Sequence, residues 1–232
     1  DKLESNQLVA IINSYDMCII GGGNFLELKW PYSISGTTLN FGLDKISKPI
    51  SIISVGFDKY KYKSNELDQK FLGWLKSGKN INLKISLRND GSTNQLNNIL
   101  NKENEFGFIN SGLDNAFLLP ASPLKKVKKR LGINVVEDMS DIRFVSVEQQ
   151  ARFYESVGEL CNFYLNNGWE IRFIPHIPSD LMAIINVVKY FSSKHSRSKL
   201  WSVASLENST KTADKIWDEY AQCERVLAMR FH

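Results

Sequence analysis

The sequence contains no long hydrophobic run and few cysteines, and both shortages exclude whole classes of protein. No apolar run approaches the ~20 residues that a membrane-spanning helix needs, and the strongest run, Ile50 to Val55, has the length of a β-strand. The three cysteines (Cys18, Cys161 and Cys223) lie far apart in apolar stretches and show no CxxC spacing. Because no signal-peptide pattern is visible either, these residues indicate buried thiols in a reducing compartment. We therefore expect a cytoplasmic protein without a transmembrane segment.

The net charge is also small, which limits the kinds of partner that the chain can bind. The 232 residues include 29 Lys and Arg against 25 Asp and Glu, a formal net charge of +4. This charge fits a small anionic substrate or peripheral association with an acidic membrane surface, such as the inner face of the membrane. It is too small to indicate a nucleic-acid partner. With 43% hydrophobic and 23% charged residues, the chain is globular, and its length suits one large domain or two of roughly 100–150 residues.

Short apolar segments alternate with segments of helical period along the chain. We predict strands at residues 17–20, 50–55, 81–87, 133–136, 170–174, 200–204 and 226–229, and helices at 64–78, 92–100, 147–167, 181–191 and 210–223. Such alternation predicts parallel sheets with right-handed crossovers. The fold class is therefore α/β, with two Rossmann-like domains at residues 1–125 and 126–232.

The segment from Pro120 to Gly132 interrupts this alternation. It holds two prolines and a run of basic residues, namely Lys125, Lys126, Lys128, Lys129 and Arg130. We interpret the segment as the connection between the two halves. The basic run fits a solvent-exposed helix face, and docking to an anionic membrane or a glycan is the alternative interpretation.

In open parallel sheets, ligands bind where strands end and helices begin, so residues that follow the predicted strands are candidates. The first such segment is Gly21-Gly22-Gly23-Asn24. Glycines let backbone amides approach an anion closely, although a tight structural turn explains the same residues. The segment is neither a GxGxxG motif nor a Walker loop, which disfavours a nicotinamide-dependent enzyme.

Two further candidates lie in the first half of the chain. Arg88 ends a predicted strand, where its guanidinium can hold a phosphate or a carboxylate, and a salt bridge to Asp90 is the alternative. Asp114 precedes an apolar stretch and is either a turn residue or a catalytic carboxylate.

The second half adds two polar segments that follow strands. His176 and Asp180 come after the strand at 170–174, so His176 is a candidate acid, base or ligand donor and Asp180 is a candidate ligand contact or helix cap. Arg230 and His232 follow the last strand and alternate around Phe231, so on an extended segment both point the same way. A cation beside a proton donor suits a phosphate-bearing substrate that must be protonated.

Taken in order, these segments resemble the polysaccharide pyruvyl transferases. The resemblance covers about Tyr15 to His232, and its most specific part is the Arg-x-His ending. The sequence departs from the family pattern at Asn89, where Asp more often follows the arginine directly, and at Phe231, where Leu is usual.

The resemblance implies a GT-B-like fold of two Rossmann-like domains with the active site between them. It implies transfer of pyruvate from phosphoenolpyruvate to two hydroxyls of one sugar of a surface polysaccharide or its precursor, which gives a cyclic ketal. Arg88 and Arg230 would bind the donor and His232 would be the general acid. His176 would be a second catalytic candidate, with contact to the sugar or the phosphate as its favoured role. The loop at Gly21, Gly22 and Gly23 would shape the cleft or approach the acceptor, a lipid-linked or nucleotide-linked saccharide.

Other interpretations stay open. A GT-B glycosyltransferase that uses a nucleotide-sugar shares the architecture, and a non-catalytic glycan-binding protein of polysaccharide assembly is a third possibility. No cofactor is expected besides the donor substrate, and no metal site, because the three histidines (His176, His195 and His232) lack ligand spacing. The chain starts at Asp1 and stops at His232, the last residue of the Arg-x-His segment, so we expect a truncation at the carboxyl terminus.

Overall fold

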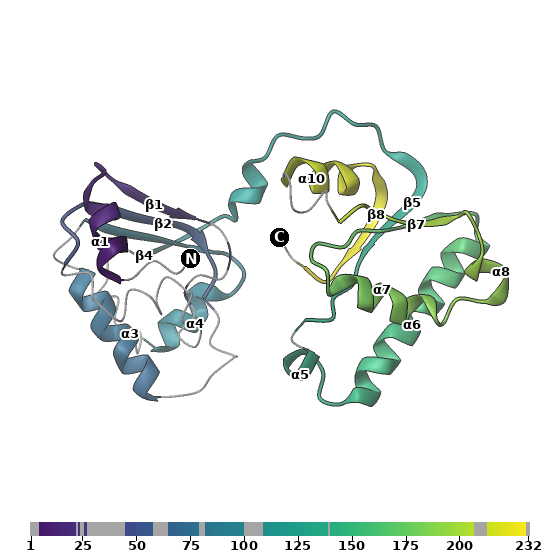
Figure 1. Ribbon diagram of the computed structural model, residues 1–232, viewed down its shortest axis with the longest axis horizontal. Helices are drawn as coiled ribbons and strands as arrows, with labels where there is room; N and C mark the ends of the chain where they lie inside the picture. The colour runs from purple at the N-terminus through teal and green to yellow at the C-terminus, as the bar shows by residue number, and fades with distance from the viewer. Residues whose placement is uncertain are drawn as a thin grey trace. The chain divides into compact units, whose positions relative to one another are not determined.

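The computed structural model describes residues 5–21, 23, 26, 45–57, 65–78, 82–99, 109–138, 140–206 and 213–230. The chain divides into two compact units, Asp1–Leu119 and Pro120–His232, which Figure 1 colours from purple to teal and from teal to yellow. Each unit is an α/β body built on a four-stranded, all-parallel sheet. The α/β class and the two Rossmann-like parts predicted from the sequence are thereby confirmed.

The first unit has its strands in sequence order. Its elements are α1 (Ser5–Asn13), β1 (Cys18–Gly21), β2 (Ile50–Val55), α3 (Asn65–Ser77), β3 (Leu83–Arg88), α4 (Ser92–Ile99), β4 (Ile109–Gly112) and the 3-10 helix η2 (Asn115–Leu118). The sheet order is β1-β2-β3-β4, and every pair is parallel. The strands predicted at 17–20, 50–55 and 81–87 are confirmed with small shifts at their ends, whereas α1 and β4 were not predicted.

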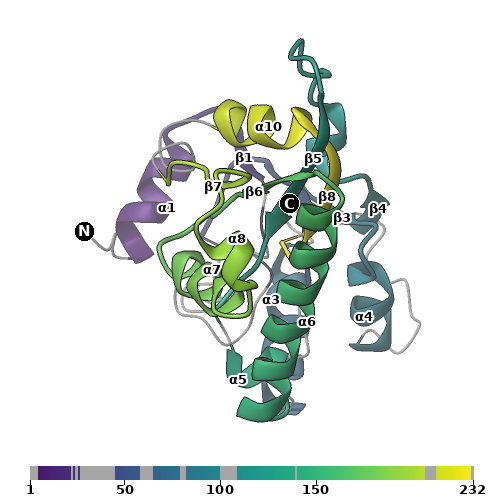
Figure 2. The same cartoon turned by 90° about the vertical axis from the view of Figure 1, so that its right-hand side faces the viewer.

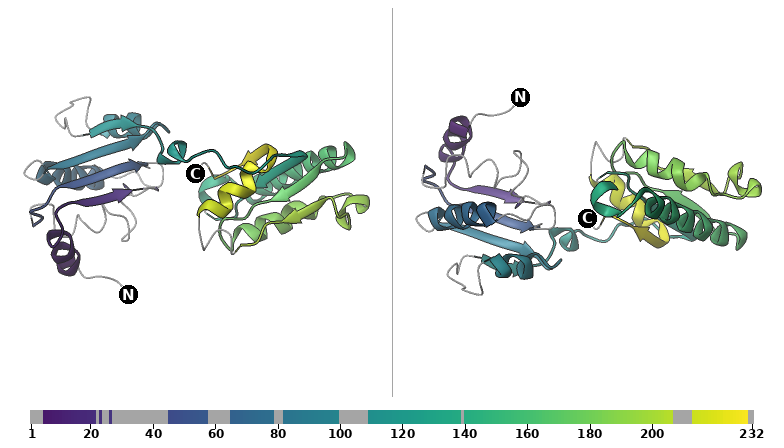
Figure 3. Two further views of the ribbon diagram at one scale, coloured as in Figure 1. Left: turned by 90° about the horizontal axis from the view of Figure 1, so that it is seen from above. Right: turned by 90° about the horizontal axis from the view of Figure 1, so that it is seen from below.

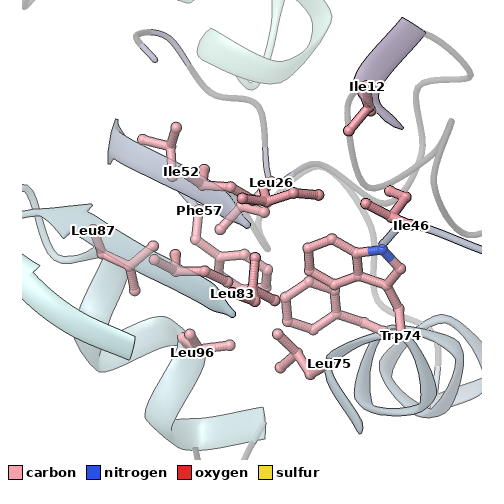
Figure 4. Close-up of a cluster of buried hydrophobic side chains, with 14 residues drawn as sticks. Ile12, Leu26, Ile46, Ile52, Phe57, Trp74, Leu75, Leu83, Leu87 and Leu96 are labelled. Carbon is pink, nitrogen blue, oxygen red and sulfur yellow. The ribbon is translucent and has the colours of Figure 1, made fainter. Parts of the chain in front are cut away.

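The core of the first unit lies between the sheet and α3. Phe71, Trp74 and Leu75 of α3 are almost completely buried against strand residues such as Ile52 and Leu83 (Figure 4). The ring centroids of Phe71 and Trp74 lie 5.6 Å apart in a stacked arrangement. Residues 71 and 75 lie one helical turn apart, so both side chains lie on the same face of α3, toward the core.

The second unit has a different strand order. Its elements are β5 (Val127–Asn134), α5 (Ser140–Arg143), α6 (Val147–Asn166), β6 (Glu170–Phe173), α7 (Asp180–Val188), α8 (Ser193–Ser196), β7 (Trp201–Val203), α10 (Ala213–Ala221) and β8 (Cys223–Ala228). The order is β7-β6-β5-β8 with all pairs parallel. Figures 2 and 3 show α6 and α7 on one face of this sheet and α10 on the other.

This order creates a topological switch point between β5 and β8. From β5 the chain winds outward through β6 to β7, and it then crosses to the other side of β5 to form β8. Open α/β sheets bind ligands at the carboxyl ends of the strands where the strand order reverses, and here that position lies between β5 and β8. In the first sheet, the order of the described strands follows the sequence from β1 to β4 and does not reverse.

The predicted connection at Pro120–Gly132 is corrected in its second half. From Val127 onward the chain forms β5, so Lys128, Lys129 and Arg130 lie in a strand and not on a helix face. The strand begins irregularly, since its pairing with β8 shifts register between Val127 and Leu131 and Lys129 has a φ of 56°. Arg130 is bound to Glu170 of the neighbouring strand at 3.1 Å. A cross-strand ion pair therefore accounts for one charge of the basic run.

Candidate functional site

The candidate site of the second unit lies at the carboxyl ends of β5, β6 and β8. Asn134, the last residue of β5, is completely buried and connects the two neighbouring strand ends. Its Nδ2 donates to the carbonyl oxygen of Ile174 after β6 at 3.0 Å, and its Oδ1 accepts from the backbone N–H of Arg230 after β8 at 3.1 Å. This single side chain fixes the spacing of the two loops that carry His176 and Arg230.

Arg230 lies at the switch point and is held by two carboxylates. Its Nε and Nη2 donate to the two oxygens of Asp180 at 3.2 and 2.7 Å, and Nη2 also donates to Oδ1 of Asp138 at 2.7 Å. Burial opposes the charged form, but the hydrogen bond and charge of Asp180 outweigh it, so the pKa of Arg230 is raised. The remaining nitrogen, Nη1, has no hydrogen-bond partner among residues that the structure describes.

Asp180 organises this cluster from inside the fold. Its side chain is 0% exposed at the first residue of α7. Besides binding Arg230, the carboxylate accepts the backbone N–H of His176 at 2.9 Å and that of Ile177 at 3.3 Å. Ser179 makes no side-chain capping bond, so Asp180 closes the loop that precedes the helix. In this geometry Asp180 orients Arg230 and the His176 loop, and it does not face solvent.

His176 pairs with a residue of the opposite helix layer. Its Nε2 lies 2.7 Å from the hydroxyl of Tyr220 on α10, and the two rings meet edge to face with centroids 5.7 Å apart. Burial and the positive charge of Arg230 lower the pKa of His176, more than the carboxylate of Asp180 raises it. Burial also raises the pKa of Tyr220. Both groups are therefore neutral at pH 7, which makes the imidazole a hydrogen-bonding group and a potential proton acceptor.

The first unit holds a second polar cluster, at the carboxyl ends of β3 and β4. The side chain of Arg88 is 3% exposed and lies 2.9 Å from Asp90 and 3.9 Å from Asp114. Burial opposes ionisation of Asp90, but hydrogen bonds from Ser92 and the charge of Arg88 outweigh it and lower its pKa. The ion pair between Arg88 and Asp90 was one of two interpretations of the sequence. The structure shows this pair, with both side chains largely buried.

The end of β2 adds a strained residue to this cluster. Ser54 has a φ of 54°, which is uncommon for a residue with a β-carbon, and it lies in the irregular part of the β2–β3 pairing. Its buried hydroxyl lies 2.7 Å from the carbonyl oxygen of Leu113 and 2.6 Å from Oδ1 of Asn115. The strain is thus offset by contacts that tie β2 to the segment after β4.

The predicted glycine loop is only partly described. Gly21 ends β1, and Gly23 has a φ of 72° and accepts the backbone N–H of Gly56 at 3.0 Å through its carbonyl oxygen. The predicted loop residues Gly22 and Asn24 lie outside the described residues. The positive φ at Gly23 is one that glycine adopts without strain, which fits the tight turn proposed from the sequence.

The structure therefore brings together His176, Asp180 and Arg230, and it places Arg88 and the glycine loop in the other unit. His232 and Phe231 lie outside the described residues. Three residues of the cluster were not predicted, namely Asn134, Asp138 and Tyr220. Asn134 and Asp138 follow the pattern of polar residues at the end of an apolar strand, which could have identified them, whereas nothing in the sequence marks Tyr220.

Two features are absent from the residues that the structure describes. No group of three or more His, Cys, Asp or Glu side chains in this part of the chain could hold a metal ion. None of the helices within the described ranges is long and apolar enough to cross a membrane.

Comparison with known proteins identifies the family. Searches among curated proteins and among solved structures gave no significant match. The family model for polysaccharide pyruvyl transferase, in contrast, matches residues 1–232. This match agrees with the order of the strand-end segments, from the glycine loop to Arg230. The chain belongs to the polysaccharide pyruvyl transferase family.

Proposed function

We propose that this chain transfers the pyruvate unit of phosphoenolpyruvate to two hydroxyls of one sugar, forming a cyclic ketal and releasing phosphate. Family membership indicates a pyruvyl transferase that acts in polysaccharide synthesis. The observation that carries the finer proposal is the position of Arg230, a cation held at the switch point beside the neutral His176. A donor with a phosphate and a carboxylate needs such a cation.

The reaction requires that the site supply a proton to the donor and accept protons from the sugar hydroxyls. The enol CH2 of the donor takes up one proton to become a methyl group, and the adjacent C2 gains cationic character. Two sugar hydroxyls each form a C–O bond to C2 and each lose a proton, while the bond from C2 to the phosphate oxygen breaks. One of the two protons balances the methyl group, and the other leaves with hydrogen phosphate.

We assign residues of the site to donor binding and to these proton transfers. We assign Arg230 to the donor anion, and His232, two positions further along the chain, to protonation of the CH2 by the family resemblance. His176 is neutral at pH 7 and has one ring nitrogen engaged by Tyr220, so we assign it to accept a proton from an attacking hydroxyl. Arg88 and the glycine loop are proposed to contact substrate from the first unit, and the acceptor is proposed to be a lipid-linked or nucleotide-linked saccharide.

The decisive test is phosphate release from phosphoenolpyruvate over a panel of surface-polysaccharide precursors. We choose Arg230→Lys because removing the cation altogether would leave the buried Asp180 unpaired and destabilise the fold. Lys keeps the charge but loses the two-pronged geometry, so we expect release to fall by at least ~100-fold. Arg225→Lys is the matched control, since Arg225 lies in β8, the strand that precedes Arg230, but contacts Tyr164 and Trp169.

A binding experiment separates this proposal from a nucleotide-sugar glycosyltransferase. Phosphoenolpyruvate should raise the melting temperature of the protein, and UDP and GDP should not. Stabilisation by a nucleoside diphosphate alone would contradict the proposal. Glycan binding without any phosphate release would favour a non-catalytic assembly protein.

A further inference from the structure

Asp138 contacts two arginines, Arg143 and Arg230. Its Oδ1 accepts from Nη2 of Arg230 at 2.7 Å, and its Oδ2 lies 3.9 Å from Nη2 of Arg143 on α5. Nε of Arg143 also donates to the backbone carbonyl oxygen of Asp138 at 3.0 Å. One carboxylate thus contacts two guanidinium groups from different parts of the unit, one after β8 and one within α5.

The charges of this cluster cancel. Arg143 and Arg230 contribute two positive charges, and Asp138 and Asp180 contribute two negative charges. A neutral cluster attracts an anion weakly, because Arg230 already has carboxylates at 2.7 Å and Arg143 has one at 3.9 Å. Strong binding of an oxyanion at Arg230 therefore requires that one carboxylate give up its place.

Asp138 is the carboxylate that can move. Its side chain is 27% exposed and it lies in the loop between β5 and α5, whereas the side chain of Asp180 is 0% exposed. Asp180 also accepts two backbone N–H groups that would lose their partner if it left. The described contacts of the Asp138 carboxylate are those to the two arginines.

We propose that Asp138 occupies the position of an oxyanion of the substrate, and that Arg143 and Arg230 together bind this oxyanion when it replaces Asp138. Arg143 is thus a second anion-binding arginine of the second unit, next to Arg230. The oxyanion is the phosphate or the carboxylate of the donor, an identity that rests on the proposed function. The exchange itself requires only an anion that carries two or more oxygens with the spacing of a carboxylate.

The test measures anion affinity in variants of the full chain. Inorganic phosphate, pyruvate and phosphoenolpyruvate are titrated by calorimetry into the wild type, Asp138→Asn, Asp138→Asn/Arg143→Gln and the control Asp141→Asn. The control removes the same charge from an exposed residue three positions away on α5. A thermal melt of each variant shows that the fold is retained.

We expect Asp138→Asn to bind phosphoenolpyruvate, and phosphate or pyruvate, roughly tenfold tighter than the wild type does, because the cluster gains one net positive charge. The control should change affinity by less than about twofold, and removal of Arg143 should abolish the gain. If the affinity rises more for phosphate than for pyruvate, the phosphate of the donor is the group that replaces Asp138. If it rises more for pyruvate, the carboxylate is that group.

Two results would overturn the inference. One is equal or weaker binding of every anion by Asp138→Asn, which would show that Asp138 helps to hold Arg230 in place. The other is a gain that persists without Arg143. Tighter binding of phosphate without any binding of phosphoenolpyruvate has a different meaning, because the exchange would stand while the proposed donor would be wrong.

Discussion

Asp180 offers the sharpest test of how the site is held together. Its carboxylate accepts four hydrogen bonds, two from Arg230 and one each from the backbone N–H groups of His176 and Ile177, at distances from 2.7 to 3.3 Å. Asp180→Asn keeps the shape of the side chain but removes its charge and turns an NH2 group toward donors. The variant therefore leaves Arg230 with a single ionic partner, Asp138, and leaves at least one N–H without an acceptor.

The expected loss can be worked out from these contacts. Breaking a buried ion pair by removing one partner costs roughly 3–5 kcal/mol, and the lower end applies because the side chain of Arg230 is 20% exposed and Asp138 remains. A loss of about 3 kcal/mol lowers the melting temperature of a unit of this size by roughly 10–20 °C. Circular dichroism melts of the purified variant measure this shift.

The control and the refuting outcome follow from burial. Asp141→Asn makes the same chemical change at an exposed position, where substitutions usually cost less than about 0.5 kcal/mol. In the double variant Asp180→Asn/Arg230→Gln, the second substitution should cost less than it does alone, because the pair is already broken. A melting temperature within about 3 °C of the wild type for Asp180→Asn would refute the view that this ion pair holds the site together.

Four further outcomes are expected from burial and packing. The pKa of His176 is lower in the folded protein than in the unfolded chain, so the unfolded chain binds the imidazole proton more tightly. The contribution of His176 to the free energy of unfolding is therefore full above pH 6.5 and is lost as the pH falls toward the pKa of the folded state. His176→Gln should flatten the pH dependence of the melting temperature between about pH 5 and 8. Thiol titration of the native protein at about pH 8 should detect Cys18 alone, because the other two cysteines are almost completely buried and burial raises their pKa values. Gly158→Ala should destabilise the protein by about 1–3 kcal/mol in denaturant unfolding, since its β-carbon would lie 2.6 Å from that of Tyr190. Gly73→Ala, in open space on α3, should stabilise it by up to about 1 kcal/mol.

The strands of the core could be predicted because their sequences are apolar and end in glycine, proline or polar residues. Ile50 to Val55 forms β2 with the predicted bounds, and the helix predicted at 147–167 corresponds to α6, where Ser146 accepts the N–H of Gln149 as an N-cap. The strand β4 could not be predicted from its residues, since Ile109–Gly112 has one large apolar side chain. Its pairing with β3 depends on backbone hydrogen bonds and on Gly112, where a β-carbon would lie 2.3 Å from Oγ of Ser86.

The start of β5 shows a different limit of sequence reasoning. A run with three charged residues in four positions has the composition of a solvent-exposed connection, and these positions do lie at the exposed end of the strand. These positions form a strand because the backbone of β5 pairs with β6 and β8. The contact of Arg130 with Glu170 and the bond from the N–H of Lys129 to Glu224 add to this pairing. Those partners are 40 and 95 residues away in the sequence, so local strand propensity does not indicate them.

The same limit explains why the sequence identified the members of the site but not their contacts. His176, Asp180 and Arg230 were recognised because each follows a strand, and parallel strands bring their carboxyl ends to one edge of a sheet. Which of them meet depends on the order β7-β6-β5-β8, which places β8 beside β5 and thereby brings Arg230 to Asp138. A prediction that treats Arg230 as a free cation for the donor overlooks this neighbour. The anion affinity of the site is therefore set by the exchange between Asp138 and the substrate, a property of the topology and not of the Arg-x-His motif alone.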